Sequence, residues 1–436
     1  MQPNFVLIVS DDMGYSDLPT YGDSAIPTPN LDRLARHGVL FTDGYSTAPI
    51  CTPSRIGILS GRYQQRFGIY DMYGRPHDFR MWRGQANLAG TLSSNGYATG
   101  LIGKWHMGPH HCISGTQPGH PEEYGFDEYV GIDWSMSSYR PGSTLYRGRE
   151  AFEAPEYLTD FFGKEACRFI ESHREERFFL MLAFNAVHAP LEARDMDLGD
   201  LGGEFPGSAD RKTYAAMLAS MDRNVGRVLD KLGDLGLDGN TFIGFVNDNG
   251  GGGNNTPKHT RNTARNAPLR GFKFDLYDGG IRVPMMLSGP GVPAGETCRS
   301  MVSAMDFAPT FLAAADIEPD SAEPDGADLL PHLNGSELPP HDALFWCNRR
   351  WDGPFQAQRP IESHNRAIRE GRWKMVRPGV PDDGSEAPPW ELYDLSADIG
   401  EQHNLAPECP ETVARLDARH REWLSAMPEP APREDE

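Results

Sequence analysis

The stretch Phe5-Val6-Leu7-Ile8-Val9-Ser10-Asp11-Asp12 decides the fold that we expect for this chain. Its first residues form a short continuous apolar run, which is typical of a strand covered on both faces of a parallel sheet. Two carboxylates follow directly at the carboxyl end of that strand. A helix is then predicted to begin after Thr28, as N-cap, with Pro29 at its first position, and to end near His37-Gly38. The segment therefore predicts a first strand–helix unit.

The same pattern recurs along the chain. Buried strands are predicted at residues 98–103, 178–184 and 242–246, and a helix at residues 88–95. A long helix is indicated by an apolar face whose members alternate spacings of four and three: Tyr214, Leu218, Met221, Val225, Val228 and Leu232.

Polar residues follow the carboxyl ends of these strands. In open α/β sheets, ligands bind outside the carboxyl ends of the strands, so these residues are expected to meet in one site. Each alone has a plainer interpretation, as a turn residue or a structural histidine, and only their combination indicates function. The predicted set is Asp11, Asp12, Lys104, His106, His188, Asp248 and Asn249.

A cysteine motif supports this interpretation. Cys51-Thr52-Pro53-Ser54-Arg55 continues as Ile56-Gly57-Ile58-Leu59-Ser60-Gly61-Arg62. It resembles the signature of the type I sulfatases, in which Cys-x-Pro-x-Arg followed by Leu-(Ser/Thr)-Gly-Arg directs conversion of the cysteine to formylglycine. A cysteine beside Pro and Ser without this extended match would more often be a buried or redox cysteine.

Further blocks resemble the same family, in the family's order. Leu269-Arg270-Gly271-Phe272-Lys273 precedes Asp278-Gly279-Gly280-Ile281-Arg282-Val283-Pro284, where Asp278 replaces the commoner Glu. Near the C-terminus, Glu391-Leu392-Tyr393-Asp394-Leu395 and Glu401-x-x-Asn404-Leu405 are similar to the C-terminal subdomain of sulfatases. The resemblance therefore covers nearly the whole chain.

The resemblance implies an α/β fold of the alkaline-phosphatase-like superfamily. We expect a large catalytic domain at residues 1–340, with a central, mostly parallel sheet flanked by helices. A small C-terminal α+β subdomain with an antiparallel sheet is expected at residues 341–436. The length of 436 residues suits one large and one smaller unit. A linker rich in Pro, Gly and acids is predicted at 320–340, short strands at 343–347, 366–369 and 373–376, and a terminal helix at 411–427.

The resemblance also implies a metal site. Asp11, Asp12, Asp248 and Asn249 would bind a divalent cation together with the modified Cys51. Because these donors are hard oxygens without thiolate or imidazole, the expected ion is Ca²⁺ rather than Zn²⁺, with Mg²⁺ as an alternative.

The catalytic roles follow from charge and from the family match. A formylglycine hydrate attacks sulfur with one hydroxyl, and the other hydroxyl later expels sulfate. Arg55 would hold this hydrate, while Lys104 and Lys273 would bind sulfate oxygens and stabilise the developing charge. His188, as the family match suggests, would protonate or polarise the leaving oxygen, and His106 would take a proton from the hydrate as the sulfate is expelled.

The sequence indicates less about the substrate than about the reaction. Loop residues that combine aromatic and basic character lie at 131–149 and 349–364, and they either bind sugars or join the two domains. We assign substrate binding to Trp134, Arg140, Arg147, Arg350 and Trp351. The chain has a net charge of −21 and no dense run of Lys and Arg, which disfavours nucleic acid, anionic membranes and long polyanions. We expect an exo-acting enzyme for a sulfated mono- or oligosaccharide.

Partners and compartment are expected as follows. A formylglycine-generating or sulfatase-maturating enzyme would modify Cys51. The chain has no apolar run long enough to span a membrane and no signal peptide as written, which predicts a cytoplasmic enzyme, or a periplasmic or secreted one if a signal was removed. Five cysteines besides Cys51 predict no disulfide framework.

Two alternatives to a sulfatase stay open from the sequence. The first is a phosphonate or phosphate ester hydrolase of the same superfamily, because the same nucleophile and cation can attack phosphorus. The second is a non-catalytic protein that binds sulfated glycans.

Overall fold

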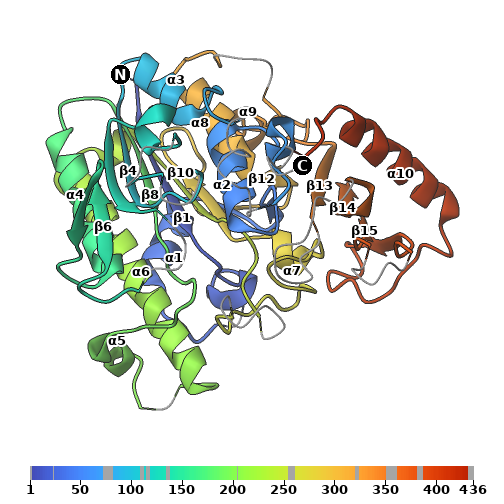
Figure 1. Ribbon diagram of the computed structural model, residues 1–436, viewed down its shortest axis with the longest axis horizontal. Helices are drawn as coiled ribbons and strands as arrows, with labels where there is room; N and C mark the ends of the chain where they lie inside the picture. Colours follow the sequence, from blue (N-terminus) through green and yellow to red (C-terminus); the bar gives the residue numbers. More distant parts are fainter. Residues whose placement is uncertain are drawn as a thin grey trace.

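The computed structural model describes most of the chain, in the following segments: residues 2–22, 24–71, 82–108, 112–113, 118–133, 138–203, 205–253, 261–319, 324–349, 361–380 and 386–430. In these residues the architecture is a large mixed sheet flanked by helices, with a second, antiparallel sheet near the C-terminus (Figure 1). The predicted fold class is confirmed.

The four predicted strands form the centre of the large sheet. They are β1 (Asn4–Ser10), β4 (Ala98–Lys104), β8 (Phe178–Ala183) and β9 (Thr241–Asn247), and their order is β9-β1-β8-β4. All neighbouring pairs among them are parallel. Every residue of β1 is buried, as its apolar run predicted.

Shorter strands extend the sheet on both sides. Beyond β9 lie β10 (Met285–Ser288), β2 (Gly38–Phe41) and β11 (Glu296–Cys298), with β10 antiparallel to both neighbours. Beyond β4 lies β5 (Glu128–Ile132), which is parallel, and then the antiparallel pair β6 (Thr144–Arg147) and β7 (Glu150–Glu153). The sheet has ten strands in the order β11-β2-β10-β9-β1-β8-β4-β5-β6-β7.

Helices cover both faces of this sheet. The face of Val6 and Ile8 packs against α1 (Pro29–Arg36), α4 (Leu158–Ser172) and α6 (Ala209–Asp234). The face of Phe5 and Leu7 packs against α2 (Cys51–Ser60), α3 (Leu88–Ser94) and α8 (Phe307–Ala314). Smaller elements are α5 (Asp195–Asp200), α7 (Asp278–Ile281) and the parallel pair β3 (Gly44–Tyr45) and β12 (Val302–Ser303). In the described residues, no helix is both long and apolar enough to cross a membrane.

The first helix begins where the sequence predicted, but it is capped differently. Thr28 occupies the N-cap position, yet its side chain makes no capping hydrogen bond. The carboxylate of Asp222 on α6 instead accepts hydrogen bonds from the backbone N–H groups of Asn30 and Leu31 at 3.1 and 2.8 Å. A tertiary contact therefore satisfies the donors that a local cap was expected to satisfy.

The C-terminal sheet contains the three predicted strands and one more. It consists of β13 (Ala343–Asn348), β14 (Asn365–Glu370), β15 (Trp373–Arg377) and β16 (Glu391–Asp394), all antiparallel. The predicted terminal helix is α10 (Pro410–Ser425), which packs on this sheet through Leu416. The segment predicted as a linker contains a short helix, α9 (Leu330–Leu333), so it is not irregular throughout. The boundary at residue 340 stays a prediction.

A buried charge network joins this small sheet to α7 and β3, which lie beside the large sheet. Asp278 at the start of α7 accepts hydrogen bonds from Lys374 Nζ of β15 at 2.7 Å and from Tyr45 Oη at 2.9 Å. Glu401 accepts the backbone N–H of Asp278 at 2.7 Å and lies 3.6 Å from Lys374. The side chain of Lys374 is fully buried between the two carboxylates. The Asp-Gly-Gly block of the sequence is thus part of a joint between the two sheets.

We predict that Lys374→Met destabilises the protein by about 3–5 kcal/mol, because it leaves Asp278 and Glu401 facing each other without their shared cation. The measurement is the free energy of unfolding in denaturant. Lys231→Met is the matched control, since Lys231 pairs with Glu171 on the surface. Equal effects of the two substitutions would contradict the role given to Lys374.

Candidate active site

The carboxyl ends of the four central strands bring the predicted polar residues together. Asp11 and Asp12 follow β1, Lys104 ends β4, His188 follows β8, and Asp248 and Asn249 follow β9. Since these strands are neighbours and parallel, their ends lie at one edge of the sheet. All seven predicted residues, His106 included, are buried.

Cys51 reaches this edge from the first residue of α2. Its Sγ and one carboxylate oxygen each of Asp11 and Asp248 all lie within 4.8 Å of one another. The cysteine side chain is fully buried. Its place in the first turn of a helix, where backbone N–H groups point toward the site, favours negative charge at this position.

Two glycines of the cysteine motif have steric roles. A Cβ at Gly57 would lie 2.2 Å from Thr47 Oγ1, so only glycine lets α2 approach that residue closely. Gly61 ends the helix with φ +67°, and its N–H donates to Gly57 O. These two residues of the motif therefore position α2 in the fold rather than taking part in catalysis.

Three cations neutralise three buried carboxylates. Lys104 Nζ lies 2.5 Å from Asp11 Oδ2, and Lys273 Nζ lies 2.8 Å from the Asp12 carboxylate. Arg55 Nε donates to Asp248 Oδ2 at 2.8 Å. Predicted residues from three strands, the helix α2 and one loop are thus paired in one buried cluster.

This pairing sets the ionisation of the site. Burial favours the neutral form of Asp11, but Lys104 and His188 outweigh it and hold the pKa of this carboxyl below its ordinary value. Burial, reinforced by the charge of Asp11, raises the pKa of Asp248 to about 6. Burial also raises the pKa of the Cys51 thiol.

His188 presents one ring nitrogen to the cluster. Its Nδ1 lies 2.6 Å from Ala189 O, and because a carbonyl only accepts hydrogen bonds, Nδ1 carries a proton and donates it. Its Nε2 lies 3.5 Å from Asp12 Oδ2, so this is the nitrogen that can exchange a proton in the site. Burial and the charge of Lys273 lower the pKa of His188.

His106 and Asp12 each adopt a strained backbone conformation. Their φ angles of 51° and 58° lie in the left-handed region, which residues other than glycine rarely adopt. Burial and the nearby charge of Lys104 lower the pKa of His106 well below its ordinary value. Strain of this kind is retained where the surrounding structure imposes it, and it gathers at functional sites.

The donor atoms fit a hard divalent cation. Asp11 Oδ1 and Asn249 Oδ1 are buried and accept no hydrogen bond from the residues that the structure describes. Asn249 is held in place by its amide nitrogen, which donates to Asp12 Oδ1 at 2.7 Å. Unpartnered oxygens beside three carboxylates are the donors that Ca²⁺ or Mg²⁺ takes. The predicted ligands therefore suit the predicted ion.

The substrate residues are less well placed. Trp134, Arg350 and Trp351 lie outside the described residues. Arg140 is exposed, with Nε 3.4 Å from Glu192 Oε1. Arg147 on β6 pairs with Glu165 of α4 at 3.0 Å rather than with the catalytic cluster. Their role in substrate binding stays a prediction.

Two supporting residues were missed from the sequence. Tyr139, which lies within the loop region 131–149, is buried, and its Oη lies 2.5 Å from Asn185 O and 2.8 Å from His188 O. Asn262 Nδ2 donates to Asp12 O at 2.7 Å and to Val187 O at 3.1 Å. Both hold the loop that carries His188, and no local pattern indicates such distant partners.

The mixed sheet and the buried cluster at its edge define a hydrolase of the alkaline-phosphatase-like superfamily. A family model described as Sulfatase matches residues 3–317, and one described as N-sulphoglucosamine sulphohydrolase, C-terminal, matches residues 272–425. The chain belongs to the sulfatase family and is a sulfuric ester hydrolase.

Named relatives agree with this membership. The chain is 35% identical over 375 residues to N-acetylgalactosamine-6-sulfatase of Sus scrofa, covering 79% of this chain and 68% of the relative. It is 30% identical over 483 residues to arylsulfatase A of Bos taurus, covering 98% and 89%.

Solved structures share the fold. Ps i-CgsB in complex with k-i-k-neocarrahexaose has a TM-score of 0.84 and 30% identity, covering 99% of this chain and 94% of that chain. The phosphonate monoester hydrolase of Agrobacterium radiobacter has a TM-score of 0.68 at 21% identity, covering 97% and 95%, and this likeness concerns the fold alone.

We predict that Ca²⁺ raises the melting temperature of metal-stripped protein, and that Asp248→Asn abolishes this rise by removing an anionic ligand. At a free Ca²⁺ concentration of about 100 times its Kd, binding should stabilise the native state by about 2.7 kcal/mol. Asp222→Asn is the matched control, because Asp222 is also buried with its pKa raised to about 6 but lies on α6, where its carboxylate caps the start of α1. A calcium response that survives in Asp248→Asn would contradict the site.

Proposed function

We propose that this protein is a metal-dependent, formylglycine sulfatase that removes a sulfate group from the terminal residue of a sulfated saccharide. The observation that carries the proposal is the position of Cys51, buried within 4.8 Å of Asp11 and Asp248 carboxylate oxygens at an edge that also holds Lys104 and Lys273. Sulfate esters are anionic, so their hydrolysis needs a strong nucleophile and cations that absorb charge.

Each residue of the cluster has a role in this reaction. A formylglycine hydrate at position 51 supplies one hydroxyl to attack sulfur and a second whose proton is lost as sulfate leaves. Arg55, held by Asp248, keeps positive charge beside that position. Lys104 and Lys273 exchange part of their pairing with Asp11 and Asp12 for the sulfate oxygens.

The two histidines move protons. Nδ1 of His188 keeps its proton on Ala189 O, so only the doubly protonated ring, the imidazolium, can deliver the Nε2 proton to the leaving alcohol oxygen, after which the ring is left neutral. His106, whose lowered pKa keeps the ring neutral, accepts the proton of the second hydroxyl. Tyr139 and Asn262 fix the backbone around His188 and so orient its ring.

A calcium ion would be held by Asp11, Asp12, Asp248 and Asn249 together with the modified residue 51. It would polarise the nucleophile's oxygen and add positive charge to the site. Magnesium has the same preference for hard oxygen ligands and is the alternative.

Modification of Cys51 requires access that the folded chain does not offer. The side chain has no exposed surface, and the rest of α2 is buried through Leu59. We therefore propose that the formylglycine-generating or sulfatase-maturating enzyme acts before this segment folds. The compartment in which this happens stays a proposal: the cytoplasm, or an exported location if a signal was removed.

The names of relatives support a saccharide substrate. One relative is an N-acetylgalactosamine-6-sulfatase, and one structural neighbour was solved in complex with k-i-k-neocarrahexaose. The net charge of −21 opposes the approach of long polyanions. An exo-acting enzyme that takes short sulfated chains fits both facts.

We predict that digestion of a sulfated polysaccharide to oligosaccharides raises the initial rate of sulfate release in proportion to the number of chain ends. The reason is that a compact pocket admits only a terminal residue. The measurement is the initial rate at equal total sulfate, before and after digestion. Equal rates on both preparations would show an open cleft and contradict the exo-acting proposal.

A further inference from the structure

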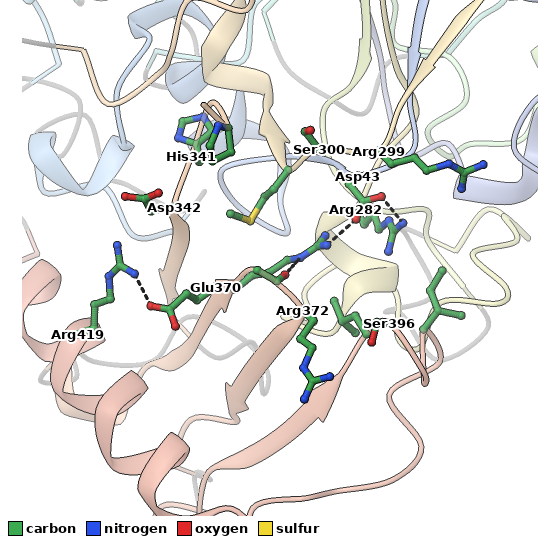
Figure 2. A pocket seen from close by; sticks show the side chains of 16 residues that line it. Asp43, Arg282, Arg299, Ser300, His341, Asp342, Glu370, Arg372, Ser396 and Arg419 are labelled. Carbon is green, nitrogen blue, oxygen red and sulfur yellow. Dashed lines mark hydrogen bonds and ion pairs between the residues drawn. The ribbon is translucent and has the colours of Figure 1, made fainter. Parts of the chain in front are cut away.

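A second cavity lies away from the catalytic cluster, between the large sheet and the C-terminal sheet (Figure 2). Its volume is about 860 Å³, within the range of small-molecule sites. None of the residues assigned to catalysis or to the metal lines it. Its walls come from the segments after β2, β11 and α7 and from the turn between β14 and β15.

The lining is rich in arginine. Five arginines face three acidic residues, which leaves two positive charges in excess in a protein whose net charge is −21. The arginines are Arg282, Arg299, Arg369, Arg372 and Arg419, and the acidic residues are Asp43, Asp342 and Glu370. The pKa of His341, also in the lining, is raised because Asp306 outweighs the effect of burial. The cavity therefore favours anions locally.

Two of the five arginines are structural. Asp43 accepts hydrogen bonds or ion pairs from Arg282 Nη2 at 3.0 Å and from Arg369 Nη2 at 2.6 Å. Both arginine side chains are nearly buried, and Figure 2 shows Arg282 beside this carboxylate. They form the inner wall and link the two sheets.

The other three arginines keep donors available. Arg299 is exposed and has no ion-pair partner among the residues that the structure describes. Arg372 is 57% exposed and lies over the Trp373 ring, and its one ion pair among the described residues is with Asp394 at 3.3 Å. Arg419 shares Glu370 with Arg415, so one carboxylate serves two guanidinium groups. A guanidinium has five N–H donors, and its fork matches the oxygens of sulfate.

We propose that this cavity is an accessory site for a sulfate group, bound by Arg299 and Arg372 at the joint between the two sheets. The group is either inorganic sulfate or a second sulfate on a saccharide. The volume exceeds the needs of one sulfate ion, and aliphatic surface from Met301, Leu395 and Ile399 lies beside the arginines. Both features suit a sulfated sugar.

The strand order of the large sheet shows where the cavity lies relative to the catalytic cluster. β2 and β11 run parallel to β9 and end near Asp43 and Arg299, so the cavity lies at the same edge of the sheet as the catalytic cluster. β2 is two strands from β9, which corresponds to about 10 Å at the usual strand spacing. A saccharide carrying several sulfates would therefore find a second cationic site on the same side of the enzyme.

The test is a count of binding sites by calorimetry in the full chain carrying Cys51→Ala, which prevents turnover. We expect two classes of site for a disulfated disaccharide or for inorganic sulfate. Arg299→Ala/Arg372→Ala should weaken the second class about tenfold or more, since each guanidinium contributes charge-assisted hydrogen bonds. Arg174→Ala/Arg421→Ala, which removes two exposed arginines elsewhere, should leave both classes intact.

The ligands distinguish the two sources of sulfate. Tighter second-class binding of the disaccharide than of sulfate, with none of its desulfated form, would assign a saccharide; equal affinities would assign the free ion. In the chain with Cys51 intact, the Arg299→Ala/Arg372→Ala variant should hydrolyse a small aryl sulfate at an unchanged rate. The proposal would be overturned by a single class of site for both ligands, or by a second class whose affinity the arginine substitutions do not change.

Discussion

The repulsion among Asp11, Asp12 and Asp248 in a buried space is the constraint on which the site depends. Isolated buried carboxylates are costly, and they persist here because Lys104, Lys273 and Arg55 each pair with one of them. Carboxyl ends of neighbouring parallel strands supply the acids, while β4, α2 and the segment before α7 supply the cations. A divalent cation would add positive charge to the same cluster, which would allow the lysines to turn to an anionic substrate.

At the joint between the two sheets, away from the catalytic cluster, buried carboxylates are again paired with cations. Asp278 and Glu401 share the buried Lys374, and Asp43 is shared by Arg282 and Arg369. Residues of the Asp-Gly-Gly-x-Arg block belong to both networks, so this block connects the large domain to the C-terminal sheet. The arginine-rich cavity borders that connection, because Asp43, Arg282 and Arg369 also line it.

Much of the architecture could be predicted because the decisive signals are local. Apolar runs located β1, β4, β8 and β9, and the polar residues after them located the site. The edge strands β6 and β7 carry no such run and were not predicted. Contacts between distant segments were also missed: Asp222 caps α1 in place of Thr28, and Tyr139 supports the His188 loop. Such partners depend on how the elements pack, which no short pattern records.

The central claim is that Cys51 becomes the formylglycine nucleophile of this cluster. The most direct measurement is the mass of the tryptic peptide containing residue 51, in active protein purified from its native host. The account predicts a peptide in which oxygen replaces the cysteine sulfur and two hydrogens are missing, in a fraction that rises with specific activity. An unmodified Cys51 in fully active protein would contradict it.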